Sequence, residues 1–133
     1  MRDLKYLGAY TIPIATAVAL GSRGWLTFSA VLVAFIIIPL AEILIGKDTA
    51  NLSEDQLKSK KHDHLFDLML YLNAPIVFGL LSWTFKNVYT INYSVVEMIG
   101  IASCIGILLA TNAINVAHEL GHRKGIFERT LSK

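Results

Sequence analysis

Two histidines spaced four residues apart are the most chemically informative feature of the sequence. They lie in the stretch His118-Glu119-Leu120-Gly121-His122. On a helix, side chains four residues apart lie on one face, one turn from each other, so the two imidazoles can share a metal ion. Glu119 points about 100° away from that face. It is therefore better placed as a base or a hydrogen-bond partner than as a third ligand, and the pattern predicts a metal site.

A stripe of polar residues precedes the histidines on the expected helix. Counted back from the motif, its members are Asn115, then Thr111 four residues earlier and Cys104 seven residues before that. Polar groups are costly in lipid, so this stripe is expected to face the interior of a helical bundle. Asn115 is placed to hydrogen-bond a ligand histidine and fix its tautomer. A neighbouring stripe of small residues predicts close helix packing, or room for a slender apolar substrate: Ser103, Gly106, Ala110, Ala113 and Ala117.

The elements that carry these residues are long apolar blocks. The chain has 133 residues and is 54% hydrophobic, which is too apolar for an ordinary soluble domain. Four blocks predict membrane-spanning helices at about residues 4–20, 25–45, 65–85 and 93–117. Chains in lipid must satisfy their own backbone hydrogen bonds, so the predicted fold is all-α: one polytopic helical domain over residues 1–133. The blocks are apolar on all faces, which argues against a soluble bundle.

The distribution of basic residues predicts the orientation. Of the twelve Lys and Arg, ten lie in the N-terminus, the loop between the second and third blocks and the C-terminal tail, with one in each short turn. The positive-inside rule then places both termini, the loop and the histidine motif in the cytoplasm. The N-terminus also resembles a secretory signal, but its removal would spoil this alternation. Because the basic residues flank membrane spans, no nucleic-acid partner is expected.

Several other residues have two interpretations. Pro13 and Pro39 interrupt the first two helices, as tolerated kinks or as the cause of a widened cavity. Glu42 is either a neighbour of a cytoplasmic metal site or a group that reaches the lipid headgroups. His62 and His64 lie in a polar loop with no apolar surroundings to order them, so solvated histidines are favoured over ligands.

The pattern H-E-x-x-H is shared by zinc proteases and by membrane non-haem iron enzymes, and its flanks favour the second class. Intramembrane proteases continue apolar after the second histidine, whereas Arg123-Lys124-Gly125 follow here. The asparagine before the motif and the basic pair after it resemble the bacterial integral-membrane alkane 1-monooxygenase family. Further resemblances are Gly24-Trp25, Pro39-Leu40 with Glu42, Gly46-Lys47-Asp48 and Phe127-Glu128-Arg129.

The resemblance implies a six-span enzyme of the bacterial inner membrane that hydroxylates the terminal methyl of medium-chain alkanes. It implies dioxygen, a histidine-bound non-haem di-iron centre and rubredoxin as electron donor. His118 and His122 would be iron ligands, and no side chain is assigned as catalytic because oxidation belongs to the iron. Ala34 and Phe35 would form part of an apolar substrate channel. Further candidates along the channel are Cys104, Leu108 and Thr111.

The chain departs from that family in its extent. It stops at Lys133, just after the first histidine box, whereas the family has further boxes and two more spans. We therefore expect an N-terminal fragment that is inactive alone. A related membrane di-iron enzyme acting on xylene-like or fatty acyl substrates has the same features. A membrane zinc metalloprotease and a structural membrane protein with an accidental motif are the remaining alternatives.

Overall fold

The computed structural model describes residues 8–45 and 64–121, and all of its regular structure there is helical. The predicted all-α class is therefore confirmed for these residues. In chain order the elements are η1 (Gly8–Tyr10), α2 (Thr11–Gly21), η2 (Gly24–Phe28), α3 (Ser29–Leu32), η3 (Val33–Ile37), α4 (Ile38–Ile45), α6 (His64–Thr90), α7 (Val95–Leu108), η4 (Leu109–Ala113) and α8 (Ile114–Gly121). The segments η1 and η2 are 3₁₀ turns, and η3 and η4 are π-helical turns.

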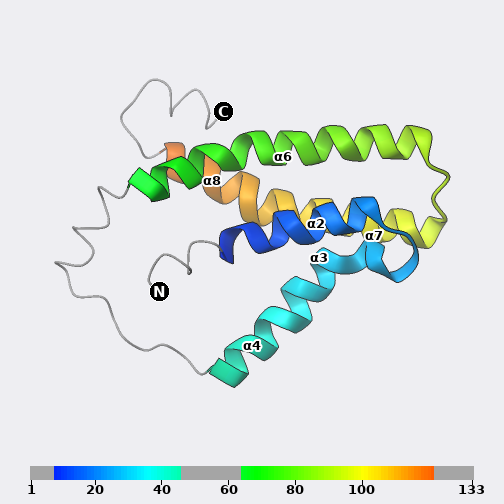
Figure 1. Ribbon diagram of the computed structural model, residues 1–133, viewed down its shortest axis with the longest axis horizontal. Helices are drawn as coiled ribbons and strands as arrows, with labels where there is room; N and C mark the ends of the chain where they lie inside the picture. The colour runs from blue at the N-terminus through cyan, green and yellow to red at the C-terminus, as the bar shows by residue number, and fades with distance from the viewer. Residues whose placement is uncertain (1–7, 46–63, 122–133) are drawn as a thin grey trace.

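These elements join into four helical rods arranged as two hairpins (Figure 1). The short turns after α2 and after α6 lie together at one end of the bundle. The beginnings of η1 and α6 and the ends of α4 and α8 lie toward the other end (Figure 1). This alternation agrees with the up-and-down path expected from the basic residues.

Two of the rods are long and apolar enough to cross a membrane by length and composition: Gly24–Leu44 and Val95–His118. Thr11–Gly21 is a shorter apolar helix. The rod beginning with α6 has 27 residues, His64–Thr90, and is longer than the predicted third block. The membrane character of the chain is thus supported by two helices, and the crossing of all four stays a prediction.

The core lies where α2, α6 and α7 meet. Its buried apolar side chains are Ile12, Leu20, Val77, Leu80, Ile101 and Leu108. A second cluster between α2, α3 and α7 consists of small residues, Ala15, Ala19, Ala30 and Cys104. Without a hydrophobic driving force between helices in lipid, such residues favour association by letting backbones approach closely. The approach is closest at Gly100, where an added Cβ would lie 2.6 Å from Thr27 Oγ1.

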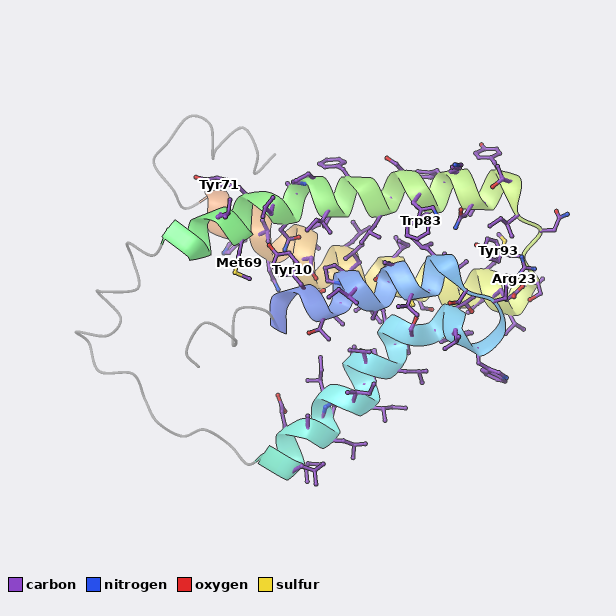
Figure 2. All side chains as sticks on the ribbon, viewed as in Figure 1. Tyr10, Arg23, Met69, Tyr71, Trp83 and Tyr93 are labelled. Carbon is purple, nitrogen blue, oxygen red and sulfur yellow. The ribbon has the colours of Figure 1, made fainter. Side chains whose placement is uncertain are left out.

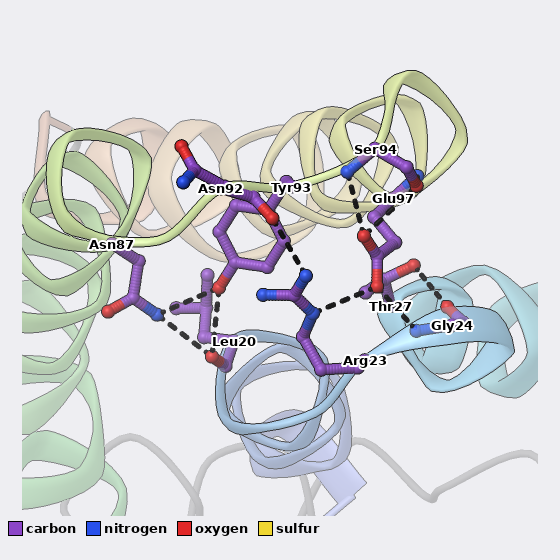
Figure 3. Close-up of polar contacts among 9 residues, drawn as sticks. All are labelled: Leu20, Arg23, Gly24, Thr27, Asn87, Asn92, Tyr93, Ser94 and Glu97. Atoms are coloured by element: carbon purple, nitrogen blue, oxygen red, sulfur yellow. Dashed lines mark hydrogen bonds and ion pairs between the residues drawn. The ribbon is translucent and has the colours of Figure 1, made fainter.

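A polar cluster joins the two short turns (Figure 3). Glu97 Oε1 accepts from Arg23 Nε at 3.0 Å and from the Gly24 N–H at 2.8 Å. Its Oε2 accepts from the Ser94 N–H at 2.8 Å, and the Ser94 hydroxyl caps α7 in return. Arg23 also donates to the Asn92 carbonyl at 2.7 Å. One carboxylate therefore starts α7 and holds the turn of the first hairpin against it.

The same end is closed on its other side by α6. Asn87 Nδ2 donates to the Leu20 carbonyl at 2.8 Å, and the Tyr93 hydroxyl lies within 3.5 Å of that carbonyl (Figure 3). The Arg23 guanidinium lies 4.9 Å from the centre of the Tyr93 ring. At the opposite end, the Tyr10 hydroxyl donates to the Met69 carbonyl at 2.7 Å and ties η1 to α6 (Figure 2). The first and third rods are therefore held together at both ends.

The second rod leaves the bundle after α3 (Figure 1). The π turn η3 lies just before Pro39, which has no N–H and whose ring crowds the carbonyl four residues back, that of Phe35. A widened turn is one way for a helix to accommodate that clash. Beyond it, the large apolar side chains Ile38, Leu40, Ile43 and Leu44 of α4 are exposed (Figure 2). Beside Pro39 the structure shows a π turn in the helix itself, and a widened cavity between helices stays a prediction. Pro13 lies in the first turn of α2, where its missing N–H costs little.

Candidate metal-ligand motif

The histidine motif begins on α8 at the end of the fourth rod. His118 lies in the last turn of α8, and its side chain is exposed. The backbone of Glu119 is helical, but its side chain lies outside the described residues, as does all of His122. The helix continues through Gly121, so the described backbone agrees with the expected helical spacing up to one residue before His122. The sharing of one metal by the two histidines stays a prediction.

The described part of the motif does not by itself form a complete metal site. Within residues 8–45 and 64–121, no three His, Cys, Asp or Glu side chains are grouped as metal ligands would be. His118 supplies one imidazole, a ligand that suits iron and zinc alike. The predicted role of His122 as a second ligand lies outside the described residues and stays a prediction. The prediction that the loop histidines are solvated is likewise untested, because His62 and the side chain of His64 also lie outside the described residues.

The π turn η4 changes which residues face the bundle. Leu109–Ala113 forms this turn, and the Ile114 N–H bonds to the carbonyl five residues back, at Leu109. A π turn takes one residue more than an α turn, so the helix after it is rotated by about 100° relative to a regular α-helix. The polar stripe was expected on the basis of an unbroken α-helix. From the π turn onward, the residues therefore lie on a different face from the one expected.

The residues of that stripe are accordingly divided between two environments. Cys104 is fully buried, and Asn112 is 4% exposed. Thr111 and Asn115 are exposed. The Thr111 hydroxyl has two acceptors within reach of its single hydrogen, the Ile107 carbonyl at 2.7 Å and Asn112 Oδ1 at 2.9 Å. The buried polar residue of this turn is thus Asn112, one position after the predicted Thr111.

The channel candidates on the fourth rod are packed in the core. The Cys104 thiol on α7 donates to the Thr27 carbonyl of η2 at 3.2 Å. Leu108 has no exposed surface and packs in the apolar core with Ile12 and Leu20. These two residues therefore help to position the rod that carries the motif, whereas Thr111 is on its outer face.

The channel candidates on the second rod lie in the π turn η3. Ala34 packs against the apolar core, while the neighbouring Phe35 is 69% exposed on the outside of the rod. The two side chains thus point to different surroundings. Glu42 is exposed on α4, which diverges from the rest of the bundle (Figure 1). The structure does not bring Glu42 together with the motif on α8.

Three buried amides were missed by the sequence analysis: Asn87 at the joined turns, and Asn112 and Asn73 farther along the bundle. Asn112 is buried because of the π turn, which the residue pattern does not reveal. Asn73 is buried on α6, two residues before Pro75. An asparagine in the middle of an apolar block next to a proline was a usable signal, because polar side chains inside such blocks usually face the bundle interior.

Comparisons with known proteins give one consistent result. No model of a protein family matches the chain. Alkane 1-monooxygenase 1 of Alcanivorax borkumensis is 29% identical over 123 residues, which is 91% of this chain and 30% of that protein. The alkane 1-monooxygenase of Pseudomonas putida is 29% identical over 112 residues, and that of Ectopseudomonas oleovorans is 30% identical over 112 residues. Each of these alignments covers 83% of this chain and 28% of the relative.

The matches extend over most of the chain and are not confined to the histidine motif. The chain spans about 30% of the length of the curated relatives that it matches. The resemblance stated from the sequence is thereby confirmed: over most of its length, this chain is similar to part of the alkane 1-monooxygenases.

Proposed function

We propose that this chain is part of a membrane non-haem di-iron monooxygenase that hydroxylates the terminal methyl of medium-chain alkanes with dioxygen. The observation that carries the proposal is the similarity to three alkane 1-monooxygenases over 83–91% of the chain. The two membrane-length apolar rods support it, because the bilayer is the natural reservoir of an alkane. Rubredoxin is the proposed electron donor, by resemblance to the family.

The proposed metal ligands of this chain are His118 and His122. An iron centre supplies the activation of dioxygen, and the chain supplies imidazoles held at a fixed spacing by α8. Asn115 and Glu119 are proposed to hydrogen-bond the ligand imidazoles and hold them in one tautomer and orientation. Both flank His118 on the same helix. Further ligands come from outside the described residues.

The proposed topology is a single membrane domain with four crossings, both termini and the motif in the cytoplasm of a bacterium. The two short turns lie together at one end of the bundle, so the chain runs along successive rods in opposite directions (Figure 1). Four such rods support an even number of crossings. The excess of Lys and Arg in the loop and the tail supports the orientation.

The substrate path is proposed to run along the second rod beside η3. An alkane forms no hydrogen bonds, so its path must be lined by apolar side chains. The π turn at Val33–Ile37 supplies such side chains, and π turns in other proteins are frequently found at functional sites. Ala34 on the bundle side and Phe35 on the outer side are the residues proposed to line it. On the fourth rod, Thr111 is the exposed candidate, while Cys104 and Leu108 support it from the core.

The test is to express the open reading frame that contains this chain in bacterial membranes, supply octane and dioxygen, and measure 1-octanol and bound iron. The proposal expects iron and octanol in the unaltered protein and the loss of both in His118→Ala. His62→Ala is the matched control, since it removes a histidine outside the motif and should change neither. Equal octanol formation by His118→Ala would contradict the proposal.

A zinc metalloprotease remains the second candidate because His-Glu-Leu-Gly-His fits that class equally well. It predicts bound zinc and proteolysis that is lost in Glu119→Gln. The related di-iron enzymes of fatty acyl or xylene-like substrates predict iron with a different product. Metal analysis separates the protease from the oxygenases, and product analysis separates the oxygenases from one another.

A further inference from the structure

One buried side-chain atom in the bundle has no hydrogen-bond partner. Asn73 on α6 is 5% exposed, and its Oδ1 is the single such atom in the described part of the chain. Buried polar atoms are almost always paired, because an unpaired one has given up its hydration without compensation. An amide oxygen has two lone pairs and accepts hydrogen bonds, so this position requires a donor.

Asn73 shares its face of α6 with apolar core residues. It lies on the buried stripe of α6 that continues through Val77 and Leu80, both of which belong to the core. Helix α6 packs against α2 and against the π turn η4. A donor from outside the chain that reaches Asn73 Oδ1 therefore lies between helices whose buried side chains are mainly apolar, with Asn112 of η4 as a second buried amide.

Both helix backbones are irregular at this level of the bundle. Asn73 lies 17 residues before the end of α6 at Thr90, and Asn112 lies 17 residues after the start of α7 at Val95. At about 1.5 Å per residue, each is roughly 26 Å from the joined turns. Asn112 is in the π turn, and Pro75 interrupts the hydrogen-bond ladder of α6 beside Asn73. The unpaired oxygen, the proline and the π turn thus come together at one depth.

The chemistry of this position favours a ligand with one O–H donor and an apolar remainder. A buried water requires about two to four polar partners. A primary alcohol requires one acceptor for its hydroxyl, and its alkyl chain is satisfied by apolar side chains. We propose that Asn73 Oδ1 accepts the hydroxyl of a primary alcohol bound between α6 and η4. This inference rests on the proposed function, whose product is a primary alcohol.

The experiment uses a photoreactive diazirine analogue of 1-octanol on the full chain in detergent micelles, followed by peptide mapping. Labelling is expected on α6 near Asn73 and on η4, and 1-octanol should compete for it more strongly than n-octane. Asn73→Leu, which has a similar shape and no acceptor, should weaken the competition by 1-octanol about fivefold, the usual effect of one neutral hydrogen bond. Asn92→Leu is the control because it exchanges an exposed amide in the second turn.

The outcomes separate this inference from the proposed function. Labelling elsewhere in the unaltered chain, or equal competition by octane and octanol, overturns the alcohol site whether or not Asn73→Leu folds. A protein that binds iron and forms octanol but is not labelled near Asn73 retains its proposed function and loses this site. Labelling near Asn73 that octanol displaces, in a protein without iron, supports the site and removes the proposed function.

Discussion

The close approach of α7 to the second rod at Gly100 gives the sharpest prediction about the fold. A Cβ at this position would lie 2.6 Å from Thr27 Oγ1 and 2.8 Å from Cδ2 and Cε2 of the Phe28 ring. Thr27 is fully buried, and its hydroxyl is held by the Gly24 carbonyl at 2.7 Å, so it cannot move aside without losing that bond. Gly100→Ala therefore forces the helices apart and should cost about 1–3 kcal/mol of unfolding free energy, the range for overpacked cores.

The matched control lies on the same helix. An added Cβ at Gly106 meets nothing within 4 Å. Gly106→Ala should therefore stabilise the protein by about 0.5–1 kcal/mol through helix propensity alone. Both variants can be compared by thermal unfolding of the chain in one mild detergent, followed by circular dichroism. If Gly100→Ala unfolded at the same temperature as Gly106→Ala, the helix crossing described here would be wrong.

A double-mutant cycle identifies the atom responsible. Thr27→Ala removes Oγ1, the nearest obstacle to a new Cβ, although it also removes the hydrogen bond to Gly24. In that background Gly100→Ala should cost measurably less than in the unaltered protein, because the two residues are in contact and their effects should not add. Additive effects would place the clash at the Phe28 ring instead.

Three further predictions concern the polar cluster at the turns and the histidine motif. Ser94→Ala should cost about 1 kcal/mol in unfolding free energy because the N-cap of α7 is lost; an unchanged denaturant midpoint would contradict this. Asn87→Leu should cost about 1–3 kcal/mol, measured the same way, since it leaves the buried Leu20 carbonyl with one weak partner at 3.5 Å; a gain in stability would refute that contact. His118→Ala should lower the iron content measured by mass spectrometry, because one of the two proposed imidazole ligands is removed; retention of iron would exclude His118 as a ligand.

The helical elements were predictable because their cause is local. Long apolar blocks indicate where the helical rods run, and Gly, Ser or Asn residues at the turns indicate where they end. The second begins at Gly24, which has a positive φ of 63° that suits glycine. The link between the turns was not predictable in the same way. Arg23 and Glu97 are 74 residues apart and meet only because both hairpins end at the same level.

The motif was recognisable from residue spacing, but the faces of its helix were not. The periodicity of an α-helix places Thr111 and Asn115 on the side of Cys104, whereas the π turn brings Asn112 inward and leaves the other two exposed. A π turn depends on packing around the helix rather than on a residue signature. The same holds for η3: the sequence analysis expected a kink or a widened cavity at Pro39 and did not predict a π turn before it.

The central claim is that the protein oxidises an alkyl chain at a metal held by His118 and His122. The most direct measurement is the formation of 1-octanol from octane under ¹⁸O-labelled dioxygen, in membranes that contain the complete product of the reading frame encoding this chain. The account predicts octanol that carries one ¹⁸O atom, bound iron in the purified protein, and the loss of both in either histidine-to-alanine variant. Zinc in place of iron, or octanol formation that persists without His118 and His122, would contradict it.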